Sequence, residues 1–162
     1  MSSKDSRPKV GVGVLVFRPD PRQTLQVLLG KRLSPYGFGA YGAPGGHLEF
    51  GESFEDCAKR EVAEECGIGI KDLRYEYLTN IVNKDSHYVH IGYSALYADG
   101  EVQTLEPKKC EAWGWYSLDA LPQPLFPATQ LDLQNFKQSQ DLDRDLIGLV
   151  GKIRASLASK VI

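Results

Sequence analysis

Residues 46–68 read GHLEFGESFEDCAKREVAEECGI, a short glycine-containing loop followed by one strongly marked helix. Ser53 is a preferred N-cap residue, and Asp56 follows three positions later, in the arrangement of a capping box. Gly67 stands where a left-handed residue commonly ends a helix. The stretch therefore predicts a helix over residues 54–66.

Three glutamates near the end of this helix, Glu61, Glu64 and Glu65, are spaced i, i+3 and i+4 and share one face. Acidic runs usually mark a solvated face. Here the carboxylates fall on the same half of the helical wheel as Phe54 and Cys57, which indicates that they turn towards a core or cleft. They also stand at the C-terminal end of the helix, where the macrodipole disfavours negative charge.

A divalent metal ion held by these glutamates would offset both penalties, because it neutralises clustered carboxylates. Ligation by oxygen alone favours Mg²⁺, with Mn²⁺ as a substitute, over zinc. Arg60 falls on the opposite, solvent-facing half of the wheel with Lys59. It can pair with Glu64 on the surface, or hold a glutamate in one rotamer for catalysis. The preceding Gly45 and Gly46 either let the backbone approach a ligand closely or make a simple turn.

The length of 162 residues suits a single domain, and the composition is that of a soluble globular protein. The net charge of -2 argues against a nucleic-acid or membrane surface. Cys57, Cys66 and Cys110 form no CxxC pair, which excludes a disulfide framework and a zinc site; the first two are expected to be packing residues. The polar N-terminus lacks the apolar stretch of a signal peptide, and no segment is apolar enough to span a membrane. We therefore expect a cytoplasmic protein.

Hydrophobic periodicity outlines one α/β domain covering residues 1–162. Residues 1–8 are expected to form a disordered tail, and residues 128–160 a helical region whose Gly148 and Gly151 weaken the case for an uninterrupted helix. Strands are expected at Val10–Phe17 (buried on both faces), Leu25–Leu29, 73–82, 87–97 and Ala112–Tyr116.

The helix and its loop resemble a known sequence motif. Gly46, five residues, Glu52, seven residues and then Arg60–Ile68 (REVAEECGI) match the Nudix box without departure. Similarity to the small cytosolic MutT-like branch of that family found in animals and plants extends over roughly residues 9–127. It is carried by Gly45–Glu52, Leu28–Arg32, Ser86–Val89, Glu106–Trp113 and Leu121–Pro122.

This resemblance implies the Nudix fold, an α/β/α sandwich around a mixed β-sheet. It implies that Glu61, Glu64 and Glu65 ligate catalytic Mg²⁺ together with the Gly46 carbonyl. It further implies that Arg60 and Glu52 orient this cluster. Members of the branch hydrolyse nucleoside triphosphates, including 8-oxo-dGTP and dCTP-type substrates, to a monophosphate and pyrophosphate. Such enzymes sanitise the nucleotide pool, and homodimers are frequent among them.

Further side chains are candidates for substrate binding, each with an ordinary structural alternative. Lys31 and Arg32 can meet phosphates or simply end a strand, and Glu111 can act as a ligand or base or remain a solvated acid. His47 adjoins the metal loop and can bind a base or phosphate. Two more residues are expected to face the nucleobase or to be core, namely Phe126, which aligns with the family's base pocket, and His90.

The attacking water is expected to lose its proton to Glu61 or Glu64. Two other functions stay open. The first is hydrolysis of another diphosphate (NADH, a diadenosine polyphosphate, a nucleotide sugar or a prenyl diphosphate), because the box reads only the metal and the diphosphate. The second is a non-catalytic nucleotide sensor on the same fold.

Overall fold

A computed structural model describes residues 7–22, 24–84 and 86–158 of the chain. Residues 1–6 of the expected N-terminal tail lie outside the described residues, and the first strand begins at Lys9. The elements in chain order are β1 (Lys9–Pro19), β2 (Leu25–Arg32), β3 (Tyr41–Gly42), β4 (Gly45–His47), α1 (Phe54–Cys66), β5 (Gly69–Asn83), β6 (Ser86–Asp99), β7 (Cys110–Ser117) and α2 (Pro127–Ala158).

The strands form one mixed seven-stranded sheet in the order β3-β2-β1-β6-β5, with β4 paired to β1 and β7 paired to β2. Strand β1 runs parallel to β6, and the remaining pairs are antiparallel. Strand β1 carries β4 beside residues 11–13 and β2 beside residues 17–19. The glycine loop therefore joins the sheet at the centre of the molecule.

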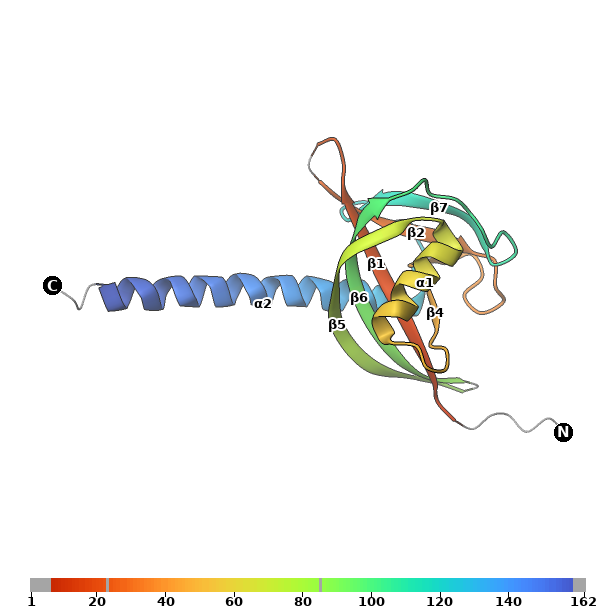
Figure 1. The fold of residues 1–162 in the computed structure, drawn as a ribbon, viewed down its shortest axis with the longest axis horizontal. Helices are drawn as coiled ribbons and strands as arrows, with labels where there is room; N and C mark the ends of the chain where they lie inside the picture. The colour runs from red at the N-terminus through yellow and green to blue at the C-terminus, as the bar shows by residue number, and fades with distance from the viewer. Residues whose placement is uncertain (1–6, 23, 85, 159–162) are drawn as a thin grey trace.

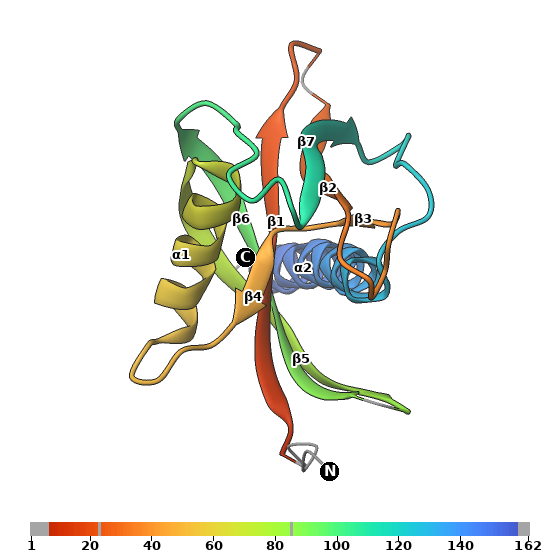
Figure 2. The same cartoon turned by 90° about the vertical axis from the view of Figure 1, so that its right-hand side faces the viewer.

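The two faces of β1 build two separate cores, as its double-sided apolar pattern predicts. Val12, Val14 and Val16 pack on one face with the buried side of α1. Leu15 and Phe17 pack on the other face with apolar residues from the start of α2. Figure 2 shows α1 and α2 on opposite sides of the sheet. The expected α/β/α sandwich around a mixed sheet is confirmed.

Helix α1 begins and ends as its sequence predicts. The Ser53 hydroxyl accepts a hydrogen bond from the Asp56 amide, 3.1 Å away, and donates one to the Asp56 carboxylate at 2.8 Å. Gly67 adopts a left-handed conformation with φ of 70° and donates to the Ala63 carbonyl. Cys57 and Cys66 are fully buried against the sheet, so both are packing residues.

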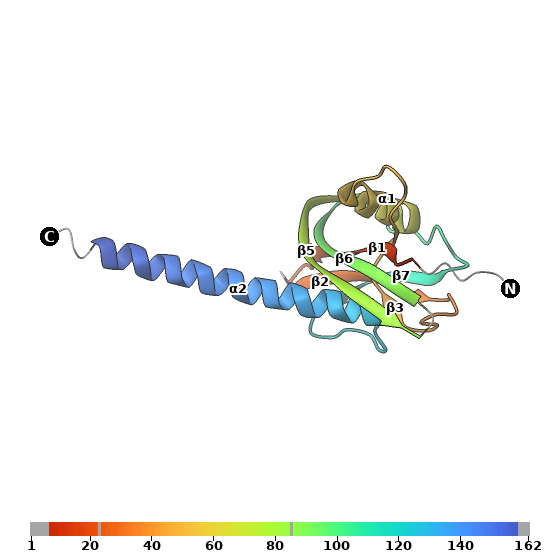
Figure 3. The same ribbon diagram turned by 90° about the horizontal axis from the view of Figure 1, so that it is seen from below.

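Helix α2 is longer and straighter than its glycines suggest. It runs without interruption through Gly148, and Figures 1 and 3 show its C-terminal half extending beyond the sheet. The part of α2 up to residue 143 is held to β5 by two contacts: the Ser139 hydroxyl donates to Glu76 at 2.7 Å, and Asp143 accepts from Arg74 at 2.8 Å. Beyond Asp143 the apolar side chain of Leu146 is exposed.

Strands β5 and β6 are longer than their apolar patterns predict. Strand β5 begins at Gly69, directly after α1, because pairing with the long β6 compensates for its many exposed polar residues. The two-residue β3 was not expected, and near β4 the sequence predicts only a short extended piece around His47–Phe50, because these strands carry too few side chains to show a pattern. Among the described residues, no helix has both the length and the apolar character needed to cross a membrane.

Candidate active site

Arg60 lies at the centre of the glutamate cluster. Its guanidinium donates to both carboxylate oxygens of Glu52, at 2.7 and 3.0 Å, to Glu61 at 2.8 Å and to Glu64 at 3.2 Å. A fifth hydrogen bond of 3.1 Å reaches the carbonyl of His47. The wheel assignment of Arg60 to the solvent face is therefore wrong, because its long side chain folds back over the acids at its own end of the helix.

This arrangement fixes the charge states around Arg60. The hydrogen bonds from Arg60 lower the pKa of Glu52 to about 2. The same bond to Glu52, with those to Glu61 and Glu64, raises the pKa of Arg60. A planar guanidinium with several donors can serve three carboxylates at once, which a lysine ammonium cannot do with the same geometry. Glu52 and Arg60 thus act as a fixed frame for the acids on α1.

The glycine loop fits closely against the same acids. The amide of Gly45 donates to Glu65 at 3.0 Å. A Cβ atom at Gly46 would overlap the Glu61 carboxylate, so only glycine lets β4 lie this near to α1. Burial, the largest cause, raises the pKa of Glu65 to about 7, although the Gly45 amide opposes the shift. A bound cation would stabilise the charged form of this buried carboxylate, which lies beside two further acids.

These groups line an acidic cleft of about 470 Å³, whose walls include Glu61, Glu64, Glu65, Arg60, Gly46, Arg32, Glu106 and Lys109. The Glu61 side chain is 13% exposed, whereas that of Glu64 is 58% exposed at the mouth. Of the two surroundings that the wheel allows, core or cleft, Glu64 faces the cleft.

The donor set of this cleft suits a hard divalent cation, because it consists of carboxylate and carbonyl oxygens. Within the described residues, no three histidine, cysteine or acidic side chains converge on one point. Arg60 holds oxygens of Glu61 and Glu64, and Glu65 is held by the Gly45 amide. The residues fit a divalent metal ion that would replace these partners and bring the carboxylates together beside Gly46.

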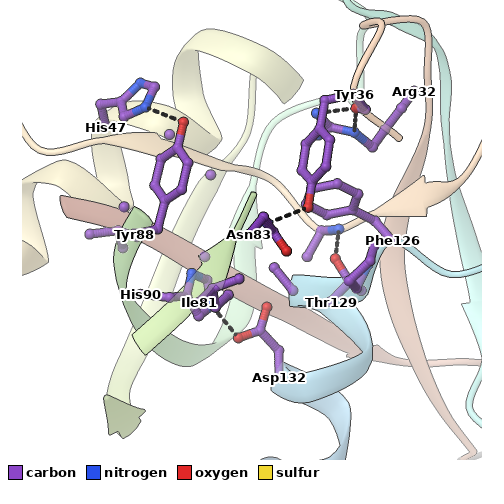
Figure 4. Close-up of a pocket in the computed structure, with 18 residues that line it drawn as sticks. Arg32, Tyr36, His47, Ile81, Asn83, Tyr88, His90, Phe126, Thr129 and Asp132 are labelled. Carbon is purple, nitrogen blue, oxygen red and sulfur yellow. Dashed lines mark hydrogen bonds and ion pairs between the residues drawn. The ribbon is translucent and has the colours of Figure 1, made fainter. Parts of the chain in front are cut away.

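A second cavity of about 200 Å³, the aromatic pocket, adjoins the cleft and is shown in Figure 4. Phe126 packs edge-on against Tyr36 with ring centroids 5.5 Å apart, and the Arg32 guanidinium lies 4.0 Å above the Phe126 ring. On the other wall, His47 stacks on Tyr88 and its Nε2 lies 3.3 Å from the tyrosine hydroxyl. Flat aromatic walls of this kind suit a planar heterocycle.

The two cavities share one wall. Arg32, Ala43, Gly45, Gly46 and His47 line both of them. A single ligand can therefore place a flat ring in the aromatic pocket and a charged group in the adjoining acidic cleft.

The structure brings four of the six candidate binding residues together in one pocket, and their roles stay predictions. Arg32, His47, His90 and Phe126 all line the aromatic pocket. Lys31 and Glu111 do not line either cavity. They form a 2.7 Å ion pair between β2 and β7, with both side chains about half exposed. Their part in substrate binding stays a prediction.

Several pocket residues were missed at the level of sequence. Tyr36, Tyr88, Asn83 and Thr129 line the pocket, and so does Asp132 on α2. Asp132 and Thr129 are spaced i, i+3 on the apolar, buried side of α2, with exposed fractions of 3% and 2%. Polar residues on an otherwise apolar helix face are the signal that would have identified them.

Comparison with known proteins agrees with this geometry. The model of the family described as NUDIX domain matches residues 7–138. The chain belongs to the Nudix hydrolase family. Its loop, helix α1 and both cavities all fall within the matched residues.

Bacterial proteins are among the curated relatives of this Nudix chain. The NAD-capped RNA hydrolase NudC of Pseudomonas aeruginosa is 39% identical over 111 residues, which are 67% of this chain and 36% of the relative. The protein of the same name from Haemophilus influenzae is 39% identical over 99 residues, 61% of this chain and 36% of the relative. The chain thus spans about a third of the length of these relatives. They give no specific support to the animal and plant branch.

Solved Nudix structures share the fold. A MutT NUDIX hydrolase from Burkholderia pseudomallei superposes with a TM-score of 0.73 at 33% identity, covering 80% of this chain and 98% of that one. The NUDIX domain of Shewanella oneidensis NrtR, complexed with ADP ribose, has a TM-score of 0.71 at 24% identity and covers 85% and 92%. The second likeness concerns the fold alone.

Proposed function

We propose that this Nudix protein hydrolyses nucleoside triphosphates, such as 8-oxo-dGTP or dCTP-type nucleotides, to a nucleoside monophosphate and pyrophosphate. The observation that carries the proposal is the wall shared by the two cavities. A base between Tyr36, Phe126 and Tyr88 would place its phosphates beside Gly46 and the glutamates of α1.

The metal requirement belongs to the same proposal. Glu61, Glu64, Glu65 and the Gly46 carbonyl would hold Mg²⁺, or Mn²⁺ in its place. When bound, the cation neutralises the diphosphate and stabilises charge on the leaving group. Arg60 and Glu52 would keep the acids in place, as their hydrogen bonds allow.

The chemical step is a hydrolysis assisted by a carboxylate. A water oxygen bonds to phosphorus, the bridging phosphorus–oxygen bond breaks, and pyrophosphate leaves with the electron pair. Glu61 or Glu64 accepts the proton of the water. Glu64 suits this role by its position, because its exposed carboxylate stands at the mouth of the cleft with one oxygen held by Arg60.

A second candidate is hydrolysis of a dinucleotide such as NADH, or of an NAD-type RNA end. It is favoured by the name of the NudC relatives, of which this chain covers 36%. The aromatic pocket of about 200 Å³ holds one ring system, so the second nucleotide would lie along the acidic cleft or outside it.

A substrate panel in Mg²⁺, with and without chelator, tests these functions. Monophosphate and pyrophosphate formed from a triphosphate, and lost on chelation, would support the proposal. Cleavage of NADH, diadenosine polyphosphates or nucleotide sugars alone would keep the metal chemistry and replace the substrate. No turnover of any panel member would favour a nucleotide sensor.

The variant Glu64→Gln separates metal chemistry from folding. We expect turnover to fall by about 10²-fold or more, with an unchanged thermal transition. Glu101→Gln, an exposed acid on the loop after β6, is the matched control and keeps full activity. Full activity of Glu64→Gln would refute the role of this carboxylate.

The homodimer and the part in nucleotide-pool sanitation rest on the family resemblance, whereas the cytoplasmic location rests on the sequence composition. Sedimentation equilibrium of the purified protein tests the first of them.

A further inference from the structure

A buried carboxylate forms the floor of the aromatic pocket. Asp132 projects from α2 and is 3% exposed, yet it is among the residues that line the pocket. Its Oδ1 atom receives the Tyr77 hydroxyl at 2.9 Å and lies 2.8 Å from His90 Nε2. Figure 4 shows Asp132 and His90 joined beneath Ile81. Two donors therefore converge on the same oxygen.

The central strands are shaped to admit this carboxylate. A Cβ atom at Gly13 on β1 would lie 3.0 Å from Asp132 Oδ2 and 2.8 Å from His90. A Cβ atom at Gly92 on β6 would lie 2.9 Å from Asp132 Oδ1 and would overlap the Tyr77 ring. These glycines are Cα partners on neighbouring strands. Two central positions of the sheet are therefore glycine, which leaves room for the Asp132 carboxylate.

A purely structural role explains this arrangement poorly. Burying a carboxylate costs free energy, and an apolar side chain of similar volume usually stabilises such a position better. The two donors occupy Oδ1, and among the described residues none donates a hydrogen bond to Oδ2. That oxygen belongs to a residue that lines the aromatic pocket. It can therefore accept hydrogen bonds from a ligand in the pocket.

We propose that Asp132, positioned by His90 and Tyr77, reads the edge of the nucleobase and selects a 2-amino-6-oxopurine, the guanine type of base. This inference deepens the proposed function and rests on it for the identity of the ligand as a nucleotide. An ionised carboxylate accepts hydrogen bonds and donates none. Its remaining oxygen, Oδ2, can accept two converging hydrogen bonds from an edge that offers neighbouring N–H groups.

Only one of the common bases offers that edge without an opposing acceptor. Guanine presents its N1–H directly beside its 2-amino group. Adenine and cytosine place a ring nitrogen lone pair next to their amino group, and thymine flanks its N3–H with two carbonyl oxygens; each would set an acceptor against the carboxylate. Oxidation at C8 leaves the N1 and 2-amino groups of guanine unchanged. Asp132 thus selects oxidised and normal guanine alike.

Binding of nucleoside monophosphates to the intact protein tests the inference without catalysis. The probes are dGMP, dIMP, which lacks only the 2-amino group, and dAMP, each titrated by calorimetry. We expect dGMP to bind about tenfold or more tightly than dIMP, and dAMP to bind more weakly still. In Asp132→Asn the preference for dGMP over dIMP should disappear. Asp145→Asn removes the same charge from an exposed position of α2 and should leave the preference unchanged.

The outcomes are decisive in either direction. Equal binding of dGMP and dIMP by the wild-type protein overturns the inference, as does a preference that survives in Asp132→Asn. If that variant does not fold, the wild-type ratio decides, and Tyr77→Phe, which removes one donor to Oδ1, should reduce the ratio. Selective binding of dGMP together with no hydrolysis in the substrate panel would uphold the base reading and refute the enzymatic proposal.

Discussion

The Arg60 guanidinium donates hydrogen bonds to both oxygens of the Glu52 carboxylate, at 2.7 and 3.0 Å, across the turn that precedes α1. Glu52 lies outside the helix that carries Arg60, so the pair fastens the loop to the helix. The remaining Arg60 donors reach Glu61 and Glu64. One side chain therefore connects the loop with the acids expected to hold the metal.

Arg60→Lys should lower kcat by about 10- to 100-fold while the protein stays folded, because an ammonium cannot bond three carboxylates in this planar arrangement. Steady-state kinetics and a Mg²⁺ titration of the variant measure the effect. Lys59→Gln alters the neighbouring exposed cation of α1 and serves as control. Wild-type kcat in Arg60→Lys would show that the frame does not matter for catalysis.

Gly46→Ala should lower activity by a comparable factor of about 10- to 100-fold, because the added Cβ atom overlaps the Glu61 carboxylate and forces it to move. A crystal structure of the variant would show the displacement. Gly39→Ala is the comparison, since a Cβ there meets no atom within 4 Å and only the left-handed backbone is strained. That variant should lose some stability and keep its kcat.

The Tyr93 hydroxyl on β6 donates to Glu55 on α1 at 2.9 Å. Burial, followed by this bond, raises the pKa of Tyr93 from 10.0 to about 12. Because the folded pKa exceeds the unfolded one, the stabilisation is fully present below pH 10 and is lost as the pH rises through 12. Tyr93→Phe should cost about 1 kcal/mol at pH 8, and the difference from wild type should shrink above pH 10. Urea denaturation of both proteins at pH 8 and above pH 10 measures their difference in unfolding free energy. A difference that stays constant would contradict the prediction.

The sequence predicts contacts between residues close along the chain well, and contacts between distant residues poorly. Ser53, Asp56 and Gly67 determine where α1 starts and stops through contacts within four residues, so a pattern reveals them. Glu61 and Glu65 are likewise found from helical spacing. The glycine loop before α1 is recognisable because Gly45 and Gly46 are consecutive.

Asp132 shows why the rest was missed. Its partners Tyr77 and His90 come from β5 and β6, 55 and 42 residues away along the chain. The helical spacing of Asp132 and Thr129 marks two buried polar residues on α2, but it does not show that Tyr77 and His90 come from distant strands to meet Asp132. Lys31 and Glu111 illustrate the opposite case. Each looks like a ligand by itself, and only the pairing of β2 with β7 shows that they neutralise one another.

Gly148→Ala tests the projecting part of α2. Gly148 is exposed, and a Cβ atom there meets no atom within 4 Å. The substitution should therefore stabilise the helix locally by about 1 kcal/mol, through the better helix propensity of alanine. The contacts from Ser139 and Asp143 to β5 lie upstream, so the global unfolding temperature should change little. Hydrogen exchange resolved by residue should show slower exchange around position 148 and unchanged exchange in β1. If protection around position 148 did not increase, this part of α2 would not behave as a simple solvent-exposed helix.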